Sequence, residues 1–178
     1  GADTILFNAA AADLANVDWT NVTAIQTAVL GAVDFAGDTL VFGALSDTCG
    51  IVTIDAALAT GTGAVTINAA DNDNNLTITG SSTATLNIVA TGGDGNDTFI
   101  TGDVDDQSST FTGGAGTNTF TVRSTDTGAA DQVLINDLKG GDILTIEAGA
   151  TDVAATVTAN FTATTATVNN AAATADTV

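Results

Sequence analysis

The stretch Gly92–Ile100, GGDGNDTFI, places three glycines and two aspartates within its first six residues. Aspartate is the short carboxylate that suits both turns and hard cations. Glycine lets the backbone turn tightly and lets carbonyl oxygens point inward. Calcium takes about six to eight oxygen ligands in a flexible geometry. The stretch therefore predicts a calcium site, with Gly92, Asp94 and Asp97 as candidate ligands.

A second copy of this pattern, GGAGTNTFT, begins at Gly113 and has Asn118 in place of the aspartate. If each half of a coil holds one such turn, the two copies lie one full coil apart, on the same side. Asp97 and Asn118 would then face one another across one site. An asparagine carbonyl can still bind calcium, but it brings one charge fewer. Gly113, Ala115 and Asn118 are the candidate ligands of this copy.

Three further aspartates lie between the two copies, at Asp103, Asp105 and Asp106. In a coil of this kind they would occupy the opposite side. Their carboxylates repel one another unless water or a cation lies between them. We therefore count them as candidate calcium ligands as well.

Short strands must position these turns. A cue recurs along the chain: a Gly, Asp or Asn turn, then Thr, then alternating apolar residues. The apolar centres follow at intervals of 9 to 13 residues, which indicates an all-β protein. These centres are Val52, Val65, Leu76, Leu86, Phe99, Phe111 and Phe120.

Two all-β architectures fit this spacing. A β-sandwich would use hairpins, longer strands and a more aromatic core. A right-handed parallel β-solenoid, or β-roll, stacks short strands with Gly, Asn and Asp at its corners. The absence of proline and an aromatic content of 4% favour the solenoid. We predict it over residues 1–149, and keep the sandwich as the alternative.

The two ends of the chain differ from this pattern. Residues 8–35 have few glycines and predict either a short helical turn near 9–15 or a strand in 21–30. Trp19 is expected to cap the N-terminal end of the core. Residues 150–178 are rich in Thr and Ala and predict a C-terminal strand or tail. Such a strand would pair with a neighbouring subunit, so deleting 150–178 should abolish polymers.

Charge excludes several partners. The formal net charge is −19, and all but one of the 21 acidic residues are aspartates. Arg123 and Lys139 are the two basic residues, so no basic patch for nucleic acid can form. Multivalent cations, calcium first, are the expected partners. No apolar run reaches the roughly 18 residues of a membrane span.

The sequence offers little for catalysis. It contains no His and no Tyr, and Cys49 is its single cysteine. Zinc and copper sites are therefore not expected, and Cys49 has no base to activate it. We predict that the chain is not an enzyme.

With these motifs, the sequence resembles RTX proteins, the secreted hemolysin-type calcium-binding repeat proteins of bacteria. The likeness is strong at 92–100, weaker at 113–121, and looser at 131–148, which is similar to the segment that closes such β-rolls. It implies Asp137 and Asp142 as further calcium ligands. Residues 14–42 and the Ala/Thr/Asp/Gly-rich composition are similar to RTX-type surface-layer proteins.

The resemblance implies a secreted structural protein that leaves by type I secretion. We expect a calcium-stabilised subunit of a surface layer or filament at the cell surface or in the extracellular matrix. Its partners would be further copies of itself, joined through strand edges, and a cell-surface polysaccharide. One intact copy and one altered copy imply one or a few calcium ions, not a long array.

Two other functions stay open. The chain could be a calcium-binding module of a secreted adhesin or enzyme. It could also be an ice-binding solenoid with rows of threonines. Because the threonine spacing varies between turns, we expect no regular threonine lattice.

Overall fold

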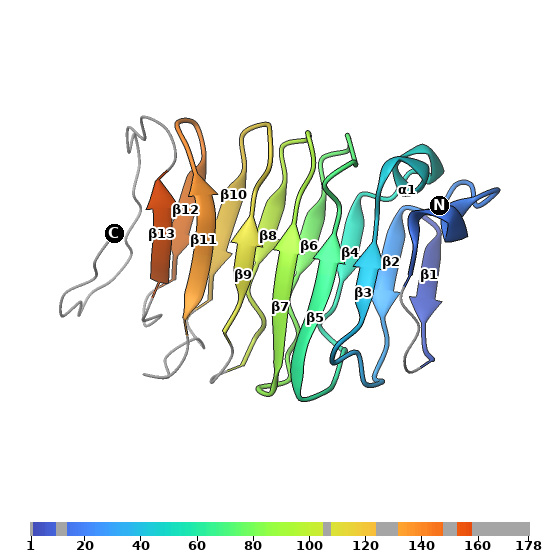
Figure 1. The fold of residues 1–178 in the computed structure, drawn as a ribbon, viewed down its shortest axis with the longest axis horizontal. Helices are drawn as coiled ribbons and strands as arrows, with labels where there is room; N and C mark the ends of the chain where they lie inside the picture. Colours follow the sequence, from blue (N-terminus) through green and yellow to red (C-terminus); the bar gives the residue numbers. More distant parts are fainter. Residues whose placement is uncertain (1, 10–13, 105–107, 124–131, 148–152, 158–178) are drawn as a thin grey trace.

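The computed structural model describes residues 2–9, 14–104, 108–123, 132–147 and 153–157. Within them the chain winds as a β-solenoid made of two parallel sheets that face one another (Figure 1). The expected parallel β-roll is confirmed, and the β-sandwich alternative is excluded because the strand pairs within each sheet are parallel. No helix in the described ranges is long and apolar enough to cross a membrane.

From β2 on, successive strands alternate between the two sheets, while β1 and β2 both belong to sheet A. Sheet A has seven strands and sheet B has six. In spatial order, sheet A consists of β1 (Thr4–Phe7), β2 (Thr27–Leu30), β4 (Thr53–Asp55), β6 (Thr77–Thr79), β8 (Thr98–Ile100), β10 (Thr119–Val122) and β12 (Ile143–Ile146). Sheet B consists of β3 (Thr39–Val41), β5 (Gly63–Asn68), β7 (Leu86–Thr91), β9 (Thr110–Thr112), β11 (Val133–Leu138) and β13 (Val153–Val157).

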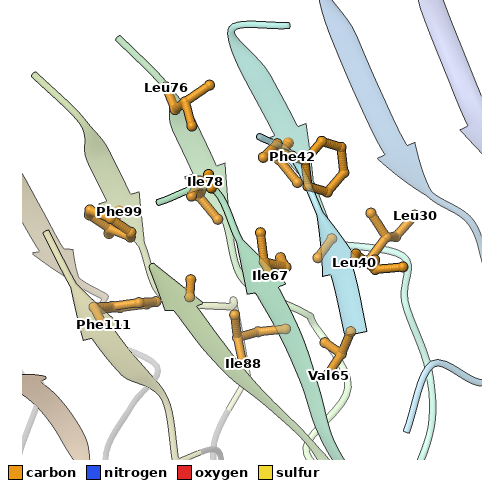
Figure 2. Packing of buried hydrophobic residues seen from close by; sticks show 14 of the residues in the cluster. Leu30, Leu40, Phe42, Val65, Ile67, Leu76, Ile78, Ile88, Phe99 and Phe111 are labelled. Atoms are coloured by element: carbon orange, nitrogen blue, oxygen red, sulfur yellow. The ribbon is translucent and has the colours of Figure 1, made fainter. Parts of the chain in front are cut away.

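The core lies between the sheets and follows the alternation of each strand. Side chains at alternate positions point inward, where Phe99 stacks on Phe120 with ring centroids 5.2 Å apart. Phe99 also packs against Phe111 from the facing sheet, at 5.3 Å. Figure 2 shows Phe99 and Phe111 beside the aliphatic residues of the middle coils. The strands are short because each needs to supply only one to three inward residues.

An outward threonine column runs along sheet A, although the threonine spacing in the sequence varies between turns. Thr77 pairs with Thr98, and Thr98 pairs with Thr119, at the first position of each strand. The complete column is Thr4, Thr27, Thr53, Thr77, Thr98 and Thr119. The column forms because differences in segment length are taken up in the loops, while the strands keep their register. The next outward column mixes Leu, Val, Asp, Ile and Thr, so the regular array is one residue wide.

The N-terminal end is closed by an aromatic group. Trp19 ends a 3-10 turn, η1 (Asn16–Trp19), and is 3% exposed. Its ring contacts Phe7 and Phe42, and its Nε1 donates to the Val41 carbonyl at 3.0 Å. This agrees with the capping role expected for Trp19. The predicted helical turn at 9–15 lies partly outside the described residues. Of the alternative strand predicted in 21–30, the structure forms the last four residues, as β2.

One helix was not expected from the sequence. It is α1 (Ala44–Cys49), which lies between β3 and β4 and ends at Gly50 with φ 104°. The turn at Gly50 also explains an error in the predicted core. Val52 is 39% exposed, whereas Ile51 and Ile54 are fully buried. Ile51 enters the core directly after the turn and leaves Val52 at the surface.

The C-terminal segment contributes to the solenoid. Strand β13 lies within the predicted tail, and it pairs in parallel with β11 at the end of sheet B. The stack of strands therefore continues past residue 149. The rest of the predicted tail, residues 158–178, lies outside the described residues.

Candidate functional site

All five loops that lead from sheet B to sheet A lie on one edge, the upper edge in Figure 1. We call this the ladder edge. Its loops are 42–52, 69–76, 92–97, 113–118 and 139–142. Both copies of the glycine-aspartate motif lie here, in neighbouring coils, as the sequence predicts. Asp103 follows β8 and lies at the opposite edge, which also agrees with the prediction.

The sixth residue of each motif forms an inner ladder of hydrogen bonds. The Leu76 amide donates to Asp97 Oδ1 at 2.8 Å, across 21 residues. The Asp97 amide donates to Asn118 Oδ1 at 2.8 Å, again across 21 residues. The Asn118 amide donates to Asp142 Oδ1 at 2.8 Å, across 24 residues. Each side chain thus accepts a peptide N–H from the preceding coil.

The second atom of each of these side chains binds within its own loop. Asp97 Oδ2 accepts from the Gly93 amide at 3.0 Å, and Asp142 Oδ2 from the Lys139 amide at 2.9 Å. Asn118 Nδ2 instead donates to the Ala115 carbonyl at 2.9 Å. Because an amide offers one acceptor and one donor group, asparagine keeps the bond between coils but reverses the one within the loop.

Asp97 is 1% exposed. Burial raises the pKa of its carboxyl group, because the charged form loses contact with water. Hydrogen bonds from the Leu76 and Gly93 amides, and the charge of Lys139, offset part of this rise. Asp97 is therefore a buried acid held by peptide dipoles.

The glycines of the first motif are needed because the loops stack closely. A Cβ atom on Gly93 would collide with the Asn72 carbonyl, and one on Gly95 with the Asn74 carbonyl. A Cβ atom on Gly92 would collide with the Asp97 carboxylate. The aspartate of the motif thus supplies a carboxylate. The glycines leave the space that the hydrogen bonds of this carboxylate and the neighbouring loop require.

Asp137, in the next coil, accepts hydrogen bonds from glycine amides of the second motif. Its Oδ1 accepts from the Gly113 amide at 2.7 Å, and its Oδ2 from the Gly114 amide at 2.8 Å. Gly114 has φ 81°, a left-handed conformation in which glycine is unstrained. Asp137 was predicted as a calcium ligand, but its two oxygens bind adjacent peptide groups.

The ladder edge also carries an outer ladder of amide side chains, which was not predicted from the sequence. Asn75 Oδ1 accepts from the Asn96 amide, and Asn96 Oδ1 accepts from the Thr117 amide, both at 2.7 Å. Here each side chain accepts from the following coil, so the direction is opposite to that of the inner ladder. The signal for it was the spacing of 21 residues between Asn75 and Asn96.

Lys139 is the basic residue on this edge. Its Nζ donates to the Gly114 carbonyl at 2.7 Å and to the Ala115 carbonyl at 3.4 Å. Nζ also lies 3.6 Å from Asp142 Oδ1. Lys139 is half-buried, while the Asp142 side chain is fully buried.

The structure brings together some of the predicted ligands and separates others. Asp97, Asn118 and Asp142 share one ladder, with the Ala115 carbonyl beside it. Asp94 is exposed on the same edge, and Asp103 is exposed on the other. Asp105 and Asp106 lie outside the described residues.

The fit of this edge to calcium can be judged from its oxygen atoms. Among the described residues, no group of three or more His, Cys, Asp or Glu side chains could hold a metal ion. The carboxylates of Asp97, Asp137 and Asp142 accept peptide N–H groups instead. An ion on this edge would therefore draw most of its ligands from carbonyl oxygens and water.

Comparison with known proteins gives no relative. No protein-family model, no curated protein and no solved structure matches this chain. The resemblance to RTX proteins therefore rests on the residues of the motif themselves.

Proposed function

We propose that the chain is an extracellular structural protein, a subunit of a filament or surface layer that assembles through its strand edges. One observation carries this proposal. In the described part of the chain, the outermost strands of sheet A, β1 and β12, each pair on one side only. An open strand edge is a template for another strand.

The hydrogen bonds tell which groups face outward. The carbonyls of Asp3 and Phe7 accept from the coil of β2, so Thr4 and Leu6 direct their peptide groups to the free edge. At the other end, the amides of Ile143 and Glu147 donate to the coil of β10, so Leu144 faces outward. Strands β1 and β12 run in the same direction, so their free edges suit parallel pairing between two copies.

The geometry of such a contact favours a polymer. The edges of β1 and β12 lie at opposite ends of the long axis (Figure 1). Pairing β1 of one copy with β12 of another is a head-to-tail contact, which leaves a free edge after every addition. Head-to-tail contacts that do not close into a ring build filaments.

Calcium stabilisation is the second part of the proposal. The nonapeptide at Gly92–Ile100 and the net charge of −19 support it. Calcium bound only by the folded chain would stabilise that state by mass action. The same features support the alternative function, a calcium-binding module of a secreted adhesin or enzyme.

A proline at Leu6 tests the assembly. Leu6→Pro removes one N–H from the free edge of β1 and leaves the bonds to β2 intact, as proline is tolerated on edge strands. We expect a folded monomer with an unchanged far-ultraviolet circular dichroism spectrum and a loss of most polymer. Electron microscopy and sedimentation would measure the polymer.

Leu6→Ala is the matched control, because it shortens the same exposed side chain but keeps the N–H. It should assemble like the wild type. Polymers that persist in Leu6→Pro would refute pairing through β1, and a wild-type chain that stays monomeric at millimolar calcium would refute the structural function.

A further inference from the structure

The three oxygen atoms around the Lys139 ammonium group form a cradle on the ladder edge. They are the carbonyl oxygens of Gly114 and Ala115 and Oδ1 of Asp142, at 2.7, 3.4 and 3.6 Å from Nζ. Carbonyl and carboxylate oxygens are the ligands of hard cations. The cradle therefore has the oxygen ligands of a cation site, and the Lys139 ammonium group occupies it.

The position of Lys139 follows from the repeat. Leu134 pairs with Thr110 and Ile143 pairs with Thr119, so 137–142 is the counterpart of 113–118 one coil further on. Lys139 is thus the counterpart of Ala115. Its side chain folds back over the preceding loop and brings a positive charge to the carbonyls of the altered motif copy.

The positive charge of Lys139 compensates negative charge on buried carboxylates. Asp142 is buried, and its carboxylate receives two peptide N–H groups besides the ammonium. The positive charge also acts on Asp97 and lowers the pKa of that buried acid. One ammonium group therefore offsets negative charge in the two coils that flank the loop 113–118, in a chain with only two basic residues.

We propose that Lys139 is a tethered cation that takes the place of a metal ion at the loop 113–118, and that removing its charge turns the cradle into a calcium site. The altered motif copy then needs no calcium in the wild-type chain. Lys139 acts this way whether or not copies of the chain assemble. This inference rests on the calcium stabilisation proposed above. The experiment below distinguishes failure of the inference from failure of that proposal.

The variant Lys139→Met keeps an apolar stem of similar length and removes the charge. Arg123→Met is the matched control. It changes the net charge equally, but Arg123 directly follows β10 on the opposite edge, where its amide donates to Thr101 Oγ1. The melting temperature of each protein is measured in chelator, in calcium and in magnesium at equal ionic strength.

In chelator, Lys139→Met should melt roughly 4 °C below the wild type, because carbonyl groups lose a charged donor. Calcium at about 1 mM, the range of extracellular sites, should restore most of this loss. Magnesium should restore less, because it demands a rigid octahedral shell. Calorimetric titration should find one more calcium ion bound by Lys139→Met than by Arg123→Met.

An equal calcium shift in all three proteins would overturn the tethered-cation proposal, as would an unchanged melting temperature of Lys139→Met in chelator. If Lys139→Met does not fold in chelator, circular dichroism decides: calcium should restore the strand spectrum, and failure to restore it would overturn the proposal. Calcium that acts on Lys139→Met but not on the wild type would refute general calcium stabilisation and leave the role of Lys139 intact.

Discussion

Asp97 connects three coils through a single side chain and its own peptide group. Its carboxylate accepts from Leu76 in the preceding coil and from Gly93 in its own loop, while its amide donates to Asn118 in the next. A buried charge is costly unless hydrogen bonds compensate it. Two peptide N–H groups provide that compensation here, and the remaining cost appears in the raised pKa of the acid.

The raised pKa predicts how stability depends on pH. Asp97 has a higher pKa in the folded chain than in the unfolded chain, where it titrates near 3.8. Its contribution is therefore fully present below 3.8 and is lost as the pH rises through the folded value. The free energy of unfolding of the wild type, minus that of Asp97→Asn, should fall as the pH rises through this window.

Asp97→Asn is the suitable reference because Asn118 already fills the same ladder position in the next coil. The other carboxylates titrate in both proteins, so their effects cancel in the difference. Denaturant unfolding from pH 3 to pH 7 would measure it. A difference that stays constant or rises with pH would contradict a raised pKa of Asp97.

Stacked loops are the elements that hold the ladder edge together. The Ala115 amide donates to the Gly93 carbonyl, and the Asp94 amide to the Asn72 carbonyl, so each loop binds the loop before it. Carbonyl groups approach so closely here that a methyl group on Gly93 has no room.

Gly93→Ala tests this packing. The new methyl group collides with the Asn72 backbone, which cannot swing away as a side chain would. We expect a loss of about 1–3 kcal/mol in the free energy of unfolding, as for other overpacked sites. Asp94→Ala, at the exposed neighbouring position, should stay within about 0.5 kcal/mol when both are measured in chelator. Equal effects of the two substitutions would show that close stacking is not what requires Gly93.

At this scale, local sequence predicts some features and not others. The alternation around Phe99 and Phe120 predicts the strands, and the 21-residue spacing predicts that Asp97 and Asn118 meet. The residue types do not reveal whether a turn carboxylate accepts peptide N–H groups or a cation, since both need oxygen atoms beside glycines. The contacts of the Lys139 side chain could not be predicted from the sequence either, because they are made with the loop one coil earlier.

The whole molecule is a stack in which each coil contacts its neighbours, as in other solenoids. Its two sheets could be predicted from regular turns and small apolar residues, because a coil of this length offers few other ways to bury them. Helix α1 could not be predicted, since six residues flanked by Gly43 and Gly50 carry no periodic pattern and no capping side chain.

Calcium should raise the stability of the whole chain. A chain with net charge −19 gains from any cation that the folded state binds better than the unfolded state. At a concentration well above the dissociation constant we expect about 2 kcal/mol, or roughly 4–8 °C in melting temperature for a chain of this size.

Differential scanning calorimetry in calcium and in chelator would measure this change. Sodium chloride at the same ionic strength is the control for simple screening. A melting temperature that responds equally to both salts would exclude a specific calcium effect.

The opposite directions of the two ladders have a consequence for the length of the protein. The loop 92–97 gives and receives ladder hydrogen bonds on both sides. The loop 113–118 does so only toward 92–97, and toward the next coil it continues the inner ladder alone. A duplicated segment 77–97, which carries Asn96 and Asp97, would therefore find a complementary neighbour above and below. Insertion of a single residue would misalign both ladders together. The chain can thus grow or shrink by whole coils, which makes the coil, and not the residue, its natural unit of variation.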